Sequence, residues 1–360
     1  MSGERGSLAT AVRSRLYRLR TAFRARNRHR FRARMAGRSR RLALPRRLAR
    51  LRARDPARPI VGVALVEHLG DIMAAEPVAR HLRRTRPEAR IVWIVCPAYR
   101  ELAAAFDAVD ETLTVGCLTE WIHLREAASS FDELFDLHLH GRSCAICQVR
   151  LERSAARRGA TIENYYDVGN LLHAFCLAGG LPGLEDRPRL RPPAGVVERV
   201  NDLGLPVPFV TIHGRSNQAV RDWSPGGWGE LAGRINSELG LGIVEIGTQR
   251  VLVDPPAGAL DLTGRTSILE SAEIIRRSAL FVGIDSGPAH LANAVGTPAV
   301  LLLGRYREFE AHMPYSGPWA HGGGGAHILR ASGPTSAIDP DRVFDAVRAA
   351  ARPARNRAAP

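Results

Sequence analysis

The residues from Asp285 to His290 have the types and spacing of an anion-binding turn. The apolar run ALFVGI leads into Asp285-Ser286-Gly287-Pro288, and a helical pattern follows directly. The first N–H groups of a helix have no intrahelical acceptor, and the helix dipole adds partial positive charge there. Gly287 lets a phosphate approach the backbone, Pro288 suits the first turn, and His290 can face a ligand. The segment therefore predicts a pyrophosphate cradle.

Two residues of this turn also have other interpretations. Asp285 is a poor phosphate ligand but a good acceptor for sugar hydroxyl groups. The structural alternative is an ordinary helix N-cap, in which the side chain of Asp285 or Ser286 accepts a hydrogen bond from the start of the helix.

A second polar group follows the strand-like run FDLHLHG. His138 and His140 alternate, so they share one face of a strand, and Arg142 stands at its end. These side chains suit contact with an anionic acceptor, as does Arg150, although a strand histidine is more often simply packed.

The cysteines indicate a reducing compartment. Their number is odd, and a chain of 360 residues does not need disulfides for its stability. Cys144 and Cys147 form a solitary C-x-x-C, which without a second pair is more often coincidence than a metal or redox site. We expect no cofactor, no bound metal and a cytoplasmic protein. The cysteines are Cys96, Cys117, Cys144, Cys147 and Cys176.

The positive charge is concentrated at one end of the chain. The formal net charge is +15, and all 51 basic residues are arginine. Residues 1–58 hold 20 arginines against Glu4 and Asp55, so the rest of the chain is close to neutral. Because the charge is concentrated in this segment, an evenly spread nucleic-acid-binding surface is excluded. In addition, no apolar run approaches the roughly 20 residues that span a bilayer.

Apolar residues recur at helical spacing within this basic segment, which fits amphipathic helices on an anionic membrane surface. A disordered arm, a start codon misplaced upstream of Met35 and a nucleic-acid tether are the alternatives. The segment lacks the features of a secretory signal. The apolar residues are Leu8, Val12, Leu16, Leu19, Phe23, Leu42, Leu44, Leu48 and Leu51.

The rest of the chain alternates strand and helix patterns, which predicts an α/β protein with parallel sheets. We expect a first Rossmann-like domain over 59–184, a proline-rich linker over 185–207, a second such domain over 208–337 and a final helix over 338–352. Ligands of such folds bind beyond the carboxyl ends of the strands. The cleft between the two domains is the expected site.

The stretch DSGPAHLANAVGTPAVLLLG resembles the signature of glycosyltransferase family 9, the ADP-heptose:lipopolysaccharide heptosyltransferases. VALVEHLGDIMAAEPVARHLRRTRP, FDLHLHGR and DLTGRTSILESAEIIRRSALFVG resemble further family segments in the same order. The resemblance covers about residues 59–352. It implies the GT-B architecture, with two Rossmann-like domains across a cleft and the nucleotide sugar held by the carboxyl-terminal domain.

The resemblance also implies roles for single residues. Asp71 matches the position of the base in an inverting transfer; without the resemblance it reads as a helix N-cap. Arg221 lies where the family has a lysine, and its guanidinium can bind a diphosphate bidentately. Thr263 and Gly264 match a position near the nucleotide. The acidic ribose contact that often follows the strand GIVEIG is missing.

The implied substrates are ADP-heptose and an acidic, lipid-linked oligosaccharide, with His140 and Arg142 as acceptor contacts. The basic segment would place the enzyme on the inner face of the inner membrane, and nucleic acid is not the expected partner. A non-catalytic nucleotide-sugar-binding or scaffold protein, or a heptosyltransferase acting on protein or capsule, is the alternative. The glycine-rich stretch 322–325 suggests a mobile flap.

Overall fold

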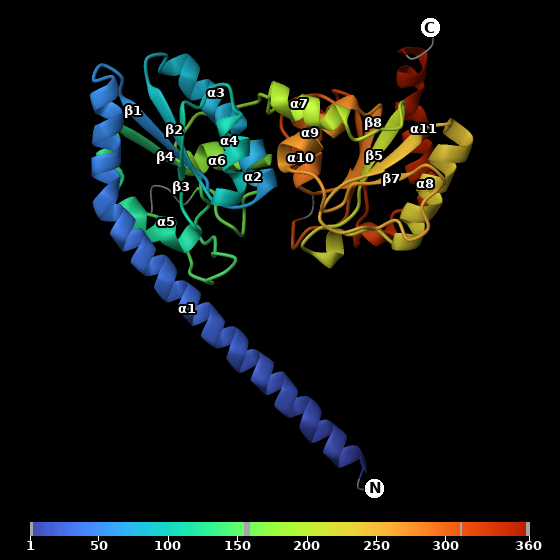
Figure 1. The fold of residues 1–360 in the computed structure, drawn as a ribbon, viewed down its shortest axis with the longest axis horizontal. Coiled ribbons are helices and arrows are strands. Elements are labelled where there is room, and N and C mark those ends of the chain that lie inside the picture. Colours follow the sequence, from blue (N-terminus) through green and yellow to red (C-terminus); the bar gives the residue numbers. More distant parts are fainter. Residues whose placement is uncertain (1–2, 155–158, 310–311, 358–360) are drawn as a thin grey trace.

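The computed structural model describes residues 3–154, 159–309 and 312–357, with the backbone alone for 3–21, 128 and 352–357. Two α/β domains lie side by side, and a long helix extends from the first of them (Figure 1). Each domain has one parallel sheet with helices on both faces. The predicted fold class is confirmed.

The amino-terminal sheet has four parallel strands in the order β3-β2-β1-β4. In the register of the sheet, Gly62 of β1 lies beside Val92 of β2 and Leu134 of β4. Because β1 is central, its carboxyl end opens toward the middle of the cleft. The strands are β1 (Ile60–Ala64), β2 (Arg90–Val95), β3 (Glu111–Thr114) and β4 (Glu133–Asp136).

Alternate residues of these strands enter two separate cores. Val61 and Val63 pack with α2 (Leu69–Ala74), α3 (Glu76–Thr85), α4 (Arg100–Ala104) and α6 (Leu171–Gly179). Ile60 and Ala64 face the other side, which is covered by α5 (Leu118–Leu124) and the end of α1 (Gly3–Arg54).

The last turns of α1 are part of the amino-terminal domain. Leu44, Leu48 and Leu51 are buried against the sheet and α5, and Arg52 forms an ion pair with Asp132 at 3.0 Å. A parallel sheet buries both faces, so this helix supplies cover that the face would otherwise lack. In the second half of the basic segment, Leu44, Leu48 and Leu51 therefore face the protein, whereas Leu42 of the same predicted stripe is exposed.

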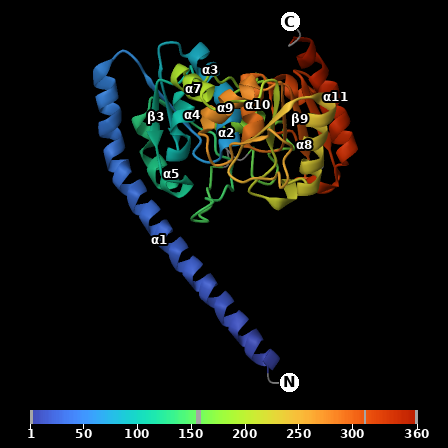
Figure 2. The same ribbon diagram turned by 45° about the vertical axis from the view of Figure 1, so that its right-hand side comes forward.

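The first half of α1 runs away from both domains (Figure 1, Figure 2). The side chains of Leu8, Val12, Leu16 and Leu19 lie outside the described residues, and Phe23 is exposed. Among the residues that are described, no helix is both long and apolar enough to cross a bilayer.

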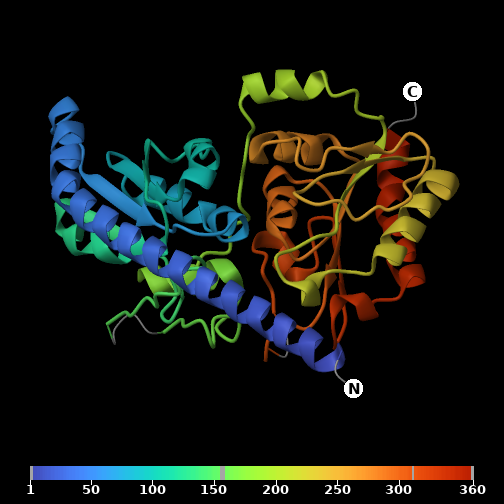
Figure 3. The ribbon, with the colours of Figure 1, turned by 60° about the horizontal axis from the view of Figure 1, so that its bottom comes forward.

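The proline-rich segment between the domains contains a helix. Extended chain reaches Pro193, and α7 (Ala194–Asn201) then packs against α9 (Ile268–Arg277) with Val196 and Val200 buried. Figure 3 shows α7 at the end of the extended chain that joins the domains, on the side of the carboxyl-terminal domain.

The carboxyl-terminal sheet has six parallel strands in the order β10-β9-β8-β5-β6-β7. Helix α9 begins with a capping box between Ser267 and Glu270, and α8 begins with Ser224 accepting from the N–H of Gly227. The strands are β5 (Phe209–His213), β6 (Gly242–Glu245), β7 (Leu260–Asp261), β8 (Leu280–Ile284), β9 (Ala299–Leu303) and β10 (Ala326–Arg330). The remaining helices are α8 (Pro225–Leu239), α10 (Gly287–Val295) and α11 (Pro340–Arg357).

The glycine-rich stretch 322–325 forms a packed turn instead of the expected flap. The N–H of Gly323 donates to the Pro318 carbonyl at 2.8 Å, and the Trp319 indole donates to the Gly324 carbonyl at 3.3 Å. Three of the four glycines have positive φ, which lets the chain reverse into β10.

Candidate active site

A cleft of about 910 Å³ lies between the domains, at the carboxyl ends of β1, β5 and β8. Both domains line it, as expected for two facing Rossmann-like units. Its lining includes seven of the predicted site residues: Asp71, Arg142, Arg221, Asp285, Ser286, Gly287 and His290.

The two walls meet where α2 packs against α10. A Cβ atom added at Gly70 would lie 2.9 Å from the ring of His290, and one added at Gly287 would lie 2.6 Å from Leu69. Both glycines therefore permit the two helix N-termini to approach. Sequence reasoning assigned Gly287 to phosphate contact alone and missed this packing role.

The start of α10 has no side-chain cap. Ser286 is the N-cap residue, but its hydroxyl donates to the Ile284 carbonyl at 3.1 Å and lies 3.0 Å from His213 Nδ1. Burial lowers the pKa of His213 to about 4, against the opposing charge of Asp222. The first-turn N–H groups of α10 are thus left without a side-chain acceptor, so the N-cap alternative is wrong here.

Arg221 is fixed beside this helix start. It ends a short 3-10 helix, its Nη1 lies 3.5 Å from Asp285 Oδ2, and its guanidinium stacks over the Tyr306 ring at 4.3 Å. Burial alone would lower the pKa of Arg221, but the charge of Asp285 outweighs it and raises that pKa. The guanidinium is held as a cation at the edge of the cleft.

Asp285 has protein partners on both sides. Besides Arg221, its Oδ2 lies 3.7 Å from His312 Nε2, and only 6% of the residue is exposed. Burial would raise the pKa of Asp285, but the neighbouring His312 ring and the charge of Arg221 keep that pKa below its usual value. The carboxylate is therefore ionised and orients Arg221.

Asp71 lies opposite, in the first turn of α2. His68, with φ of 64°, is the N-cap residue of this helix, and no side chain caps it. Asp71 does not act as the cap; instead its Oδ2 accepts from Arg142 Nη2 at 3.3 Å. Both side chains are about a quarter exposed, so the carboxylate faces the cleft and is available to a substrate.

His290 is buried between the two walls with its ring against Tyr315. Burial lowers its pKa, although the charges of Asp285 and Asp71 oppose that change. Its Nδ1 atom is buried without a hydrogen-bond partner among the described residues. A neutral imidazole nitrogen in this state is ready to bond a ligand.

Three of the predicted residues do not line the cleft. The ring of His140 accepts from the N–H of Arg153 at 3.1 Å, which points it away from the cleft. Thr263 donates through its hydroxyl to Asp261 at 2.7 Å, and Gly264 donates to the Gly247 carbonyl in a turn beyond β7.

His138 lines the cleft, but its ring bonds Asp136 and the N–H of Val66. Arg150 is exposed and pairs with glutamates.

An aromatic cluster that sequence reasoning missed lines part of the cleft and joins the two domains. Tyr165 and Tyr166 of the amino-terminal domain contact Tyr306, Phe309 and His312 of the other domain. The adjacent tyrosines of ENYYD were the available signal, but nothing local pairs them with a segment 140 residues away.

Thr248 and Gln249 were also missed. They follow β6 and line the cleft where the family resemblance led us to look for an acidic residue. Their side chains are polar but uncharged.

Comparisons with known proteins agree with this geometry. The sequence model of glycosyltransferase family 9 (heptosyltransferase) matches residues 198–321. The autotransporter heptosyltransferase Aah of Escherichia coli is 32% identical over 151 residues, which are 40% of this chain and 37% of that protein. This chain therefore spans little more than a third of the relative it matches. Lipopolysaccharide heptosyltransferase 3 of Escherichia coli is 44% identical over 50 residues, 14% of each chain.

Solved structures share the fold over a longer region. The ADP-heptose lipopolysaccharide heptosyltransferase II of Escherichia coli superposes with a TM-score of 0.63 at 19% identity, over 82% of this chain and 99% of that one. The GT-B architecture is thereby confirmed. Residues 198–321 are therefore similar to glycosyltransferase family 9, and the chain shares the GT-B fold of solved heptosyltransferases.

Proposed function

We propose that this chain is an inverting glycosyltransferase that transfers heptose from ADP-heptose. The observation that carries the proposal is the placement of Asp71 and the uncapped start of α10 on opposite walls of one cleft. An inverting displacement needs a base on one face of the sugar and a charged cradle for the leaving group on the other. The heptosyl donor is suggested by the relatives, which are named heptosyltransferases.

The two walls divide the chemistry between them. Asp71 takes the proton from the acceptor hydroxyl as that oxygen attacks the anomeric carbon, while Arg142 holds the carboxylate in place. The bond between the anomeric carbon and the diphosphate oxygen breaks, and the released negative charge is met by Arg221 and the first-turn N–H groups of α10. His290 supplies a neutral imidazole, able to donate or accept a hydrogen bond, between the two walls of the cleft. No metal is needed for these steps.

Donor identity is tested by thermal unfolding of the full chain with ADP-, UDP-, GDP- and dTDP-linked sugars. A ligand at 100 times its Kd adds about 2.7 kcal/mol to the free energy of unfolding. We expect ADP-heptose to raise Tm most. A larger rise in Tm with another nucleotide sugar would mean that this sugar, and not ADP-heptose, is the donor. No rise with any of them would favour a non-catalytic protein.

The acceptor we propose is a lipid-linked glycan of the cell envelope. The basic α1 projects from the acceptor-side domain and is suited to an anionic membrane surface, where such a glycan is held (Figure 1). A protein acceptor is the second candidate, favoured by the similarity to an autotransporter heptosyltransferase. Parallel assays with radiolabelled ADP-heptose decide between the two acceptors. The lipid-linked acceptor requires the label to enter the lipopolysaccharide fraction, and label in an autotransporter passenger domain would contradict it.

Membrane docking is tested by shortening α1. Residues 3–29 hold eight arginines and one acidic residue, and basic residues near an anionic surface contribute about 1 kcal/mol each. Deleting residues 2–28 removes this half and keeps the buried leucines of α1. We expect the full chain, and not the shortened one, to sediment with phosphatidylserine vesicles. Equal sedimentation, or stronger binding to duplex DNA than to vesicles, would contradict the proposal.

A further inference from the structure

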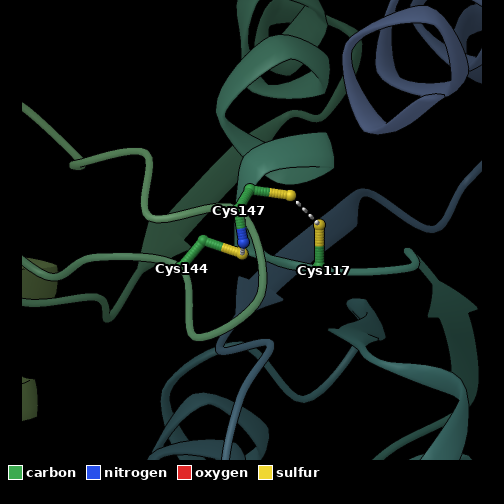
Figure 4. Close-up of side chains that lie close together, drawn as sticks. All are labelled: Cys117, Cys144 and Cys147. Carbon is green, nitrogen blue, oxygen red and sulfur yellow. Dashed lines mark hydrogen bonds between the residues drawn. The ribbon is translucent and has the colours of Figure 1, made fainter. Parts of the chain in front are cut away.

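Three cysteines meet inside the amino-terminal domain. Cys117 precedes α5, while Cys144 and Cys147 belong to a loop 27 residues later, and Figure 4 shows their side chains converging. All three are buried, and their sulfur atoms lie within 4.8 Å of one another. The C-x-x-C pair is therefore not solitary in space: the fold adds a third thiol.

The loop that carries two of the sulfurs is folded as a tight hairpin. An antiparallel bridge joins Ser143 to Arg150, and the N–H of Gln148 donates to the Cys144 carbonyl at 2.9 Å. Gln148 has φ of 58°, a left-handed conformation that is strained for this residue type. This turn places Cys144 and Cys147 side by side, facing Cys117.

The spacing of the sulfurs is close to that of a metal site. Cys117 Sγ and Cys147 Sγ are 4.0 Å apart, whereas zinc–sulfur bonds of about 2.3 Å put the sulfurs of a tetrahedral site roughly 3.8 Å apart. The N–H of Cys147 also points at Cys144 Sγ at 3.4 Å, which favours its thiolate. The three sulfurs are thus near the separations that one ion requires.

A fourth ligand is available from Glu67. Its Oε2 atom is buried with no hydrogen-bond partner among the described residues, and its carboxyl group lies beside the hairpin that carries Cys144. The N–H of Ala145 donates to the other carboxyl oxygen at 3.4 Å. Three thiolates and one carboxylate form a donor set that zinc and similar divalent ions accept.

We propose that Cys117, Cys144 and Cys147, with Glu67 as fourth ligand, bind one structural divalent metal ion of the zinc class. The ion joins three segments of the amino-terminal wall: the start of α5, the hairpin 143–150 and the loop after β1. Arg142 lies two residues before Cys144 and contacts Asp71. The metal thus fixes the position of Arg142 and takes no part in bond making.

The test is cobalt and zinc binding by the full chain, stripped with a chelator and kept reduced without oxygen. We expect one Co²⁺ per chain with a thiolate-to-cobalt charge-transfer band, displacement by Zn²⁺, and a rise in Tm when the ion returns. In Cys144→Ser the affinity for Co²⁺ should fall at least 100-fold. Cys176→Ser is the matched control, since Cys176 is buried in α6 away from the cluster.

The wild-type chain alone decides the central point, so a variant that misfolds does not weaken the test. Absence of the charge-transfer band with all five thiols reduced would overturn the proposal. So would binding by Cys144→Ser as tight as in Cys176→Ser. In Glu67→Gln we expect one ion per chain at affinity reduced about 10- to 100-fold; unchanged affinity would remove Glu67 from the site.

Discussion

The two walls of the cleft are built in different ways. The carboxyl-terminal wall contains one continuous segment in which β8 runs into Asp285 and α10 within a few residues, and Arg221 and Tyr306 join it from other loops. The amino-terminal wall joins Asp71, Arg142 and three cysteines from distant segments, and it rests on a helix that begins at the third residue of the chain. The carboxyl-terminal wall, which we propose binds the donor (the donor wall), depends in its turn from Asp285 to His290 on local backbone geometry. The amino-terminal wall, which we propose binds the acceptor (the acceptor wall), depends on tertiary packing.

The largest expected effect is a loss of stability when the packing behind the acceptor wall is disturbed. Leu48 is 1% exposed, whereas Leu42 on the same helix is 74% exposed. Leu48→Ala should lower the free energy of unfolding by about 2–5 kcal/mol, because it leaves a cavity between α1 and the sheet. Leu42→Ala is the control and should change it by less than about 0.5 kcal/mol. Equal effects in urea unfolding would mean that α1 does not cover the sheet.

On the donor wall, Arg221→Gln should reduce the transfer rate by roughly 10²- to 10³-fold, since it removes the cation that we propose faces the leaving diphosphate. ADP affinity should fall as well. Arg305→Gln is the matched control, because Arg305 is exposed, pairs only with Glu308 among the described acidic residues and lies outside the cleft lining. A normal rate in Arg221→Gln would show that the α10 N-terminus alone carries the charge.

The smallest expected effect is a pH dependence of the free energy of unfolding, which arises from His213 on the same wall. Burial lowers the pKa of His213 to about 4 from 6.5, so the unfolded chain binds a proton that the native chain does not. The stability contribution is fully present above pH 6.5 and decreases as the pH falls toward 4, by about 3 kcal/mol at most. His213→Asn should flatten this part of the curve in urea unfolding between pH 7 and pH 4. An unchanged slope would rule out His213 as its source.

The sequence predicted the donor wall better than the acceptor wall for the same physical reason. The strand and turn before α10 are where the apolar run ALFVGI and the residues Asp285-Ser286-Gly287-Pro288 predicted them. Arg221 was placed by family resemblance, and its stacking on Tyr306 needed the fold. Local patterns fix local structure, so these elements could be read directly.

Long-range contacts could not be read in this way. The spacing of Leu44, Leu48 and Leu51 predicted an amphipathic helix, but periodicity does not tell whether its apolar face meets a membrane or a sheet. Likewise, C-x-x-C was recognised, but Cys117 joins it only through the fold. His140 was expected to reach an acceptor because it alternates with His138, and the hairpin that follows turns its ring away.

The division of labour between the walls is tested most directly by Asp71→Asn, with ADP-heptose binding and heptosyl transfer measured on the same preparation. The isosteric amide keeps the hydrogen-bonding shape but cannot take the acceptor proton. Transfer should fall roughly 10²- to 10⁴-fold while the Kd for ADP-heptose stays within about twofold. Transfer equal to that of the parent chain would contradict the assignment of Asp71 as the base.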